Sequence, residues 1–97
     1  MTAVGVIATL TVADGKNAEF EAAFAELVAA VRANEPGNEF YSLTRSRANP
    51  QVYKVLERYA DQAAVDAHGS SAHFRAAGPR LAPCLAAPPE IENLDAF

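Results

Sequence analysis

The feature that most constrains this chain is a change in the spacing of its hydrophobic residues. Val4, Val6, Ala8, Leu10 and Val12 alternate with other residues, which predicts a β-strand over residues 4–12 with one apolar face. The opposite face of this segment is mixed rather than polar. We therefore expect a sheet that is covered, at least in part, on both sides.

The next segment follows a helical period. Between Lys16 and Asn34 the apolar residues recur every three or four positions and form one stripe, with most of the charged residues off it. The stripe consists of Phe20, Ala23, Phe24, Leu27, Val28 and Val31. Pro36 disfavours helical geometry at Glu35, so the helix is expected to end there.

Two further strands are predicted, over Glu39–Ser46 and Val52–Tyr59, because both segments are rich in aromatic and branched residues. The short connection between them, Ala48–Gln51, indicates a hairpin. The last residues, Glu90–Phe97, are expected to form a strand or an extended tail, with Ile91 and Leu94 as its apolar anchors.

A second helical region lies between the third and the last strand. Asp61 is a suitable cap for a short helix, Gln62–His68, and Gly69-Ser70-Ser71 is expected to interrupt it. Ser71 can cap a second segment, Ala72–Ala77. Gly78-Pro79 is expected to break or kink that segment, with helix resuming over Arg80–Ala86.

The predicted order is thus β-α-β-β-α-β, which is the ferredoxin-like α+β arrangement of an antiparallel sheet with its helices on one face. We interpret residues 1–97 as a single domain. The face of the sheet without helices needs a cover, and a second copy of the same sheet is the obvious candidate.

Size and composition support a homodimer. A chain of 97 residues buries a thin core, and small domains compensate with disulfides, metals or partners. Cys84 is the only cysteine, so an internal disulfide is impossible, and the sequence contains no cluster of cysteine and histidine ligands. Oligomerisation is the compensation that remains.

Charge and hydropathy restrict the partners and the location. The net charge is −4 and the basic residues are scattered, so nucleic acid is not expected as a partner. The apolar stretches are too short to span a membrane, and residues 1–4 contain no basic region ahead of an apolar run. These features predict a cytoplasmic protein without a membrane partner.

Glu57 is the most unusual polar residue of the predicted strands. It shares a strand face with Tyr53, Val55 and Tyr59, where a buried carboxyl group favours its neutral form unless it is paired. One interpretation is structural: Glu57 hydrogen-bonds a helix end or forms a salt bridge with an arginine such as Arg45. The other is that Glu57 takes part in catalysis.

His68 and His73 are the only histidines. Their spacing of five residues across an expected break is poor for two metal ligands on one helix, so a metal site is not predicted. A histidine is nevertheless the best proton carrier in the chain at neutral pH. For His73, beside Phe74, packing is the favoured interpretation, whereas packing and a role in proton transfer are equally open for His68.

Four motifs, in order, resemble the antibiotic biosynthesis monooxygenase family over nearly the whole chain. They are a turn and the start of a helix with Glu-Phe, residues 15–20; Glu35-Pro36-Gly37 followed by Tyr41; the strand Tyr53–Tyr59 with its acid and final aromatic; and Ala64–His68 followed by His73-Phe74. The last is the most specific, and it is similar to the signature A-x-x-x-H-x-x-x-x-H-F.

The resemblance implies a fold, a pocket and a type of chemistry. The fold is a dimeric α+β barrel in which two ferredoxin-like sheets face each other, and the pocket lies between each sheet and its helices. The family includes monooxygenases that use neither metal nor flavin, so no cofactor is expected. The pocket would be lined by Tyr41, Glu57, Tyr59, His68, His73 and Phe74.

The resemblance also suggests a role for each residue. His68 would be the catalytic base, and Glu57 would orient it or hold a substrate hydroxyl group. Tyr41 and Tyr59 would bind an oxygen substituent and Phe74 would form an apolar wall, with His73 as a further contact to substrate. Haem degradation is not expected, since the haem-binding histidine of such relatives aligns with Gly78 and the chain contains no tryptophan.

Three functions remain open from the sequence. The first is a cofactor-independent monooxygenase that joins molecular oxygen to a small aromatic or quinol-type substrate. The second is an isomerase that moves a proton on a small carbonyl metabolite. The third is a non-catalytic dimeric module that binds a small molecule or a partner protein.

Overall fold

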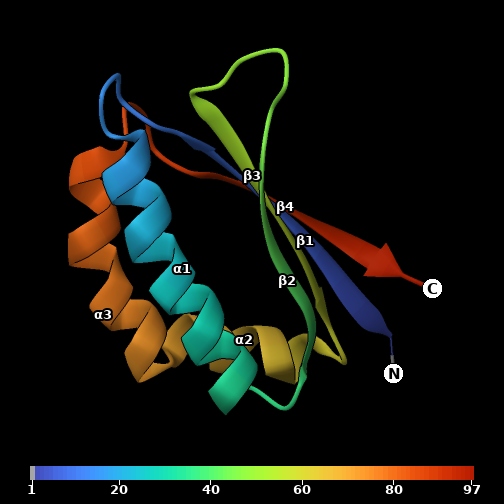
Figure 1. Cartoon of the computed structure of the whole chain (residues 1–97). Coiled ribbons are helices and arrows are strands. Elements are labelled where there is room, and N and C mark those ends of the chain that lie inside the picture. The colour runs from blue at the N-terminus through green and yellow to red at the C-terminus, as the bar shows by residue number, and fades with distance from the viewer. Residues whose placement is uncertain (1) are drawn as a thin grey trace.

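The computed structural model describes residues 2–97, which form one antiparallel sheet with all the helices on one of its faces (Figure 1). The strand order in the sheet is β2-β3-β1-β4, so β1 and β3 are central. The strands are β1 (Ala3–Thr11), β2 (Asn38–Arg45), β3 (Val52–Tyr59) and β4 (Glu90–Ala96). The helices are α1 (Asn17–Asn34), α2 (Gln62–Ser70) and α3 (Ala72–Leu81), followed by a 3-10 turn, Ala82–Cys84.

This arrangement confirms the predicted ferredoxin-like α+β fold. The hairpin between β2 and β3 is present, and the last segment is a strand paired with β1 rather than a loose tail. The caps are also as expected, because the Ala64 amide donates to Asp61 Oδ1 at 2.9 Å and the Phe74 amide donates to Ser71 Oγ at 3.2 Å. None of the helices within residues 2–97 is long and apolar enough to cross a membrane.

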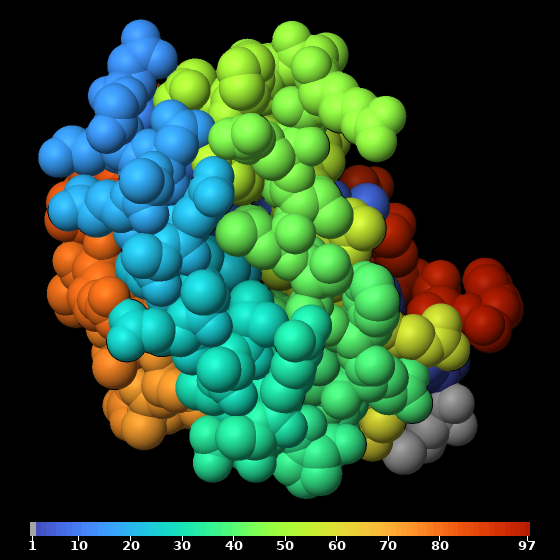
Figure 2. Space-filling model, in the orientation of Figure 1, coloured from blue at the N-terminus to red at the C-terminus, as the bar shows by residue number. Residues whose placement is uncertain are grey.

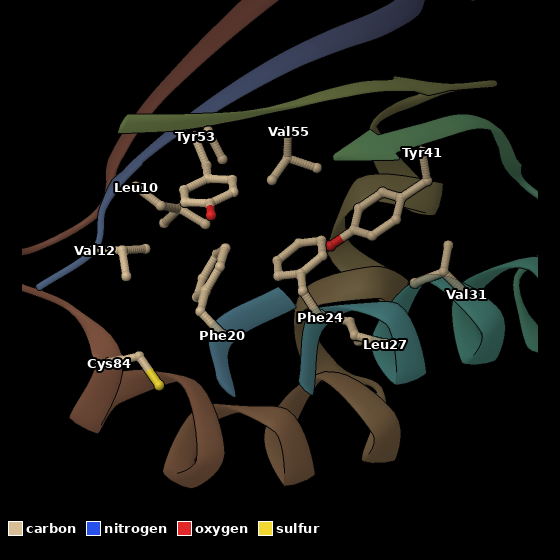
Figure 3. Close-up of a cluster of buried hydrophobic side chains, with 11 residues drawn as sticks. Leu10, Val12, Phe20, Phe24, Leu27, Val31, Tyr41, Tyr53, Val55 and Cys84 are labelled. Atoms are coloured by element: carbon tan, nitrogen blue, oxygen red, sulfur yellow. The ribbon is translucent and has the colours of Figure 1, made fainter. Parts of the chain in front are cut away.

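The core lies between α1 and the sheet (Figure 3). Phe20 and Phe24 point from α1 towards the sheet, and Tyr53 and Val55 point back from β3. The Phe20 and Tyr53 rings have centroids 4.8 Å apart, which is a tilted aromatic contact. The apolar stripe predicted for α1 therefore packs against the apolar face predicted for the strands, and together they form one core layer.

The helical region after β3 differs from the expectation in two places. Helix α2 continues through Gly69 to Ser70, and the break falls at Ser71, whose backbone is extended. Helix α3 then continues through Gly78-Pro79 to Leu81, so a break at that position is wrong. Gly78 has no Cβ, which removes one of the clashes that a proline normally makes with the residue before it.

The helix-free face of the sheet carries an apolar patch, which we define as the half-buried Ile7 and the exposed Phe40, Leu56 and Leu94. Phe40 is 51% exposed, Leu94 39% and Leu56 37%. Ile7 and Leu56 are register partners in β1 and β3, so two members of the patch are direct neighbours. The last residues of β4 also project beyond the body of the molecule, where the chain itself leaves them uncovered (Figure 2).

The turn between α1 and β2 approaches α2 closely at Gly37. A Cβ on Gly37 would lie 2.6 Å from the Ala64 Cβ, which is closer than real side chains come. The Gly37 carbonyl also accepts the Ala60 amide at 2.9 Å, just before α2 begins. The absence of a side chain at residue 37 therefore allows α2 to lie against this turn.

We predict that Gly37→Ala lowers the free energy of unfolding by about 1–3 kcal/mol, the usual range for a forced overlap in a packed site. The measurement is denaturant unfolding followed by circular dichroism. Ala64→Gly is the matched partner variant, because it removes the other methyl group. The double variant is expected to lose less free energy of unfolding than the two single variants lose together. If the two losses simply add, residues 37 and 64 do not contact each other as proposed.

Candidate functional site

A cavity of about 430 Å³ lies between the sheet and helices α2 and α3. Its size is in the range of pockets that hold small organic molecules. Most of the lining is apolar and comes from β1, α1 and the region from α3 to β4, including Leu10, Phe20, Leu27, Leu81, Leu85 and Ile91. Among its lining residues, those able to exchange or share a proton are Tyr41, Glu57, Tyr59 and His68.

These polar groups come together because β2, β3 and α2 meet at one end of the cavity. The His68 ring lies 5.3 Å from the Tyr41 ring and 5.6 Å from the Tyr59 ring, measured between centroids. The Phe74 ring lies 4.8 Å from the His68 ring. Five of the six residues predicted for the pocket therefore surround one point, with Phe74 as a wall that is itself partly open to solvent.

Glu35 holds His68 in place, and the sequence analysis did not identify it as a site residue. The His68 Nδ1 atom lies 2.9 Å from Glu35 Oε2 and 3.1 Å from Oε1. The Glu35 side chain is only 7% exposed. A buried carboxylate needs such partners, because an unpaired charge away from water is costly.

The position of Glu35 follows from its neighbour Pro36. Glu35 ends α1 with non-helical backbone angles, φ −120° and ψ 88°, and a following proline disfavours helical angles at this position. The signal that could have identified Glu35 was therefore present. A carboxylate fixed at a helix end, just before the close approach of α2 at Gly37, is well placed to meet a histidine of α2.

The second ring nitrogen of His68 opens into the cavity. In the described part of the chain every buried side-chain nitrogen or oxygen has a hydrogen-bond partner. His68 Nε2 has no hydrogen-bond partner among residues 2–97, so it is not one of these buried atoms. It is therefore accessible to a small molecule in the cavity. With Nδ1–H donated to Glu35, Nε2 carries a lone pair and is able to accept a proton.

His73 lies elsewhere than the resemblance implied. It is absent from the cavity lining and contacts the Glu35 carboxylate from the other side through Nε2. His73 instead borders a smaller hollow between α1 and α3, of about 190 Å³. The structure thus brings the two histidines together around one carboxylate, despite their unfavourable spacing in the sequence.

Glu57 is paired with a tyrosine rather than with an arginine. The Tyr59 hydroxyl donates to Glu57 Oε1 at 2.6 Å, whereas Arg45 pairs with Glu21 at 3.4 Å, so the suggested salt bridge to Arg45 is wrong. Burial raises the pKa of Glu57, while the Tyr59 hydrogen bond and the nearby His68 act in the opposite direction. Glu57 is held on β3 and faces the cavity beside His68.

The two tyrosines are donors rather than bases. Burial, and then the negative charges of Glu57 and Glu35, raise the pKa of Tyr41 far above its ordinary value. The pKa of Tyr59 is raised by burial and by its hydrogen bond to Glu57. Both phenols therefore keep their protons at neutral pH, which leaves His68 Nε2 as the best proton acceptor in the cavity.

Glu35, His68 and His73 are also the one group of three potential metal ligands within residues 2–97, with donor atoms within 4.8 Å of one another. Two histidines and a carboxylate are a known ligand combination for divalent metals. The same atoms here are engaged in hydrogen bonds with one another, and a cation would have to displace the shared protons. The geometry therefore favours a hydrogen-bonded cluster.

The comparisons with known proteins agree with this architecture. The family model described as antibiotic biosynthesis monooxygenase matches residues 3–80. The chain therefore belongs to the antibiotic biosynthesis monooxygenase family. A search of curated proteins finds no match.

Two solved structures are similar in both sequence and fold. A candidate antibiotic biosynthesis monooxygenase from Caulobacter crescentus is 50% identical, with a TM-score of 0.96 over 99% of this chain and 91% of the other. A conserved protein from Methanosarcina mazei is 30% identical, with a TM-score of 0.91 over 97% of this chain and 92% of the other. Rv0793 from Mycobacterium tuberculosis, at 23% identity, shares the fold, with a TM-score of 0.89 over 98% and 95% of the two chains.

We predict that Glu57→Gln stabilises the fold at neutral pH. Because burial raises the pKa of Glu57 above its ordinary value of 4.5, the folded state loses stability as the pH rises from 4.5 through the raised pKa. Glutamine retains an acceptor for Tyr59 and never becomes charged. Thermal unfolding should show a higher Tm for the variant at pH 7 and a shrinking difference as the pH falls below about 4.5.

The control for this experiment is Asp14→Asn, which removes a carboxylate from an exposed turn. Asp14→Asn should not show the pH-dependent increase in Tm that is expected for Glu57→Gln. A Glu57→Gln variant that is less stable than the parent at pH 7 would show that the charged form of Glu57 is favoured in the folded state, contrary to the prediction.

Proposed function

We propose that this protein is a monooxygenase that joins molecular oxygen to a small aromatic, quinol-type substrate without a metal or flavin cofactor. The observation that carries the proposal is His68, whose Nε2 atom is free in an apolar cavity while Nδ1 is bound to the buried Glu35. Membership of the family supports the reaction type. One structural neighbour, from Bacteroides thetaiotaomicron, is described as a possible oxidoreductase.

The first step is removal of a proton from a substrate hydroxyl group by His68 Nε2. The Tyr41 hydroxyl, which has no protein partner within the described chain, donates a hydrogen bond to a substrate oxygen. Glu57, held by Tyr59, lies beside the same point and accepts a hydrogen bond from a second hydroxyl group. Such positioning holds the substrate in a fixed orientation relative to His68, which lowers the entropic part of the barrier.

The deprotonated ring supplies the electrons for the reaction with oxygen. For a hydroquinone the balance closes without a further reductant: hydroquinone and O₂ give a hydroxyquinone and one molecule of water. One oxygen atom enters the ring, and the other leaves as water with two protons. The apolar walls admit oxygen and exclude bulk water, which strengthens the few polar contacts that remain.

The working form proposed here is a homodimer. The apolar patch of Ile7, Phe40, Leu56 and Leu94 lies on the helix-free face, where it has no cover within the described chain. Exposed apolar side chains that share one face of a sheet are a feature of interaction sites. A second copy of the sheet would cover the patch and the exposed length of β4, and would give the dimeric α+β barrel that the resemblance implies.

The central prediction concerns His68. Oxygen uptake with a hydroquinone should persist in protein stripped of metal and flavin, and His68→Ala should lower kcat by about 100-fold or more, the usual scale for loss of a general base. Asp66→Asn, an exposed change on the same helix, is the matched control and should retain the parental rate. Unchanged uptake in His68→Ala would exclude His68 as the base.

The dimer is tested separately with Leu56→Glu. This change places a charge in the apolar patch that the proposed interface would bury, so it should shift the protein to monomers. Sedimentation equilibrium measures the mass directly. Ala25→Glu adds the same charge on the exposed side of α1 and should leave a dimer; a parental protein that is monomeric at high concentration would contradict the proposal.

A further inference from the structure

We propose that Asn93 is a specificity-determining residue, which hydrogen-bonds an oxygen substituent at the end of the substrate that lies farthest from His68. The inference rests on the proposed function, because it takes the hydroxyl group at His68 as the other end of the substrate. It adds a second, distant polar contact and thereby sets a requirement on the length of the substrate. The contact is measurable by binding alone, without any consumption of oxygen.

Asn93 lies at the open mouth of the cavity. It belongs to β4, at the sheet edge opposite β2, and it lines the cavity. Its side chain is exposed, and two further lining residues, Ile91 and Phe74, are 58% and 41% exposed. The patch proposed for the dimer lies on the opposite face of the sheet, so a second copy there leaves Asn93 directed at the cavity. Among the lining residues within 2–97, Asn93 alone has a side-chain amide.

The sheet register places Asn93 in line with the reactive groups. Glu57 of β3 and Asn93 of β4 are both register partners of Val6 in β1. Tyr41 of β2 is in turn the partner of Glu57. Because register partners share a face of the sheet, one row of side chains runs beneath the cavity from Tyr41 to Asn93. Val6 is the apolar member of the row that separates its two polar ends.

The surroundings of Asn93 on β4 make its amide the isolated polar group of that side. In the neighbouring row Val55, Ala8 and Ile91 are register partners, and all three line the cavity. Asp95, the next residue of β4 on the same face, lies outside the cavity lining. A single polar group in an otherwise apolar region fixes the orientation of a ligand, because few positions of the ligand satisfy it.

The distance along the row indicates a substrate longer than one ring. Adjacent strands lie about 4.8 Å apart, so β3 and β4, which flank β1, are separated by about 10 Å. With the reacting hydroxyl group beside Glu57, and one hydrogen bond of about 2.9 Å to Asn93, about 7 Å remain between the two substrate oxygens. That length exceeds the separation of two oxygens on one benzene ring. It matches oxygens at opposite ends of two fused rings.

The volume of the cavity leads to the same conclusion. A cavity of about 150 Å³ is large enough to bind benzene, whereas this cavity has a volume of about 430 Å³. A single ring would leave most of that space unfilled, and apolar walls without a neighbour lose their dispersion contacts. Two fused rings that extend from Glu57 across Val6 to Asn93 would fill more of it.

An amide suits both the substrate and the product at this position. The Asn93 side chain donates through its nitrogen and accepts through its oxygen, so it can bind either a hydroxyl or a carbonyl group. It does not ionise, and therefore it does not compete with His68 for the proton of the substrate. The contact is made equally before and after proton transfer, so it should act on KM rather than on kcat.

The test is a binding titration under nitrogen with two probes. One is naphthohydroquinone, and the other is the analogue that carries a third hydroxyl group on the outer edge of the second ring. The parental protein should bind the analogue about 3- to 10-fold more tightly, the usual effect of one neutral hydrogen bond. In Asn93→Ala this preference should disappear, while the affinity for naphthohydroquinone should change little. Both affinities are measured from the shifts of backbone amide signals in NMR spectra.

Asp95→Ala is the matched control, because it removes a polar side chain from the same strand and face but outside the cavity lining. It should retain the preference for the analogue. The side-chain amide signals of Asn93 give a direct readout in the parent. They should shift when the analogue binds and should be much less affected by naphthohydroquinone.

Equal affinities of the parental protein for the two probes, the absence of binding included, would overturn the role of Asn93. A preference that persists in Asn93→Ala would overturn it as well. Neither result alters the measurement of oxygen uptake that tests the oxygenase. Conversely, a preference that depends on Asn93 in a protein without oxygen uptake would keep Asn93 as a binding residue and remove the oxygenase.

Discussion

The buried carboxylate of Glu35 is the interaction on which the site depends. An acid with a side chain this deeply covered is tolerated only if its charge is matched by donors, and the donors are two histidines from two different helices. That requirement fixes how α2 and α3 lie against the end of α1. Pro36 turns the backbone out of the helix at Glu35, and Gly37 gives α2 the room to approach.

The molecule has two regions on the helical side of the sheet, a packed apolar core and a cavity. α1 packs on the sheet through Phe20, Phe24, Leu27 and Val31, whereas α2 and α3 stand away from it around the cavity. Because α2 and α3 contribute few apolar side chains to the core, their positions depend strongly on polar contacts. His68 is thus both a structural partner of Glu35 and a group that lines the cavity.

Much of the fold follows from local sequence signals. The alternation in residues 4–12 and 52–59, the stripe in α1 and the capping residues Asp61 and Ser71 each specify their element through short-range chemistry. The path through Gly78-Pro79 was not predictable in this way, because it depends on the missing Cβ of Gly78 rather than on proline alone. The interruption expected over Gly69-Ser70-Ser71 includes the observed break at Ser71, but Gly69 and Ser70 belong to α2.

The site was only partly predictable, for a physical reason. Side chains on one strand, such as Glu57 and Tyr59, share a face by simple alternation, and the family motif suggested Tyr41, His68 and Phe74. Glu35 is 33 residues from His68 in the chain, and no local rule joins them. His73 was assigned to the pocket by its place in the same motif, but the turn at Ser71 directs it to the other side of Glu35.

The proposed chemistry requires that Glu35 fixes the proton of His68 on Nδ1 and leaves Nε2 free to act as a base. Neutron diffraction from deuterated crystals at a pH above neutral locates that proton directly. We expect deuterium on His68 Nδ1, directed at Glu35, and none on Nε2. Deuterium on Nε2 with a bare Nδ1, and the proton of that hydrogen bond on Glu35, would contradict it.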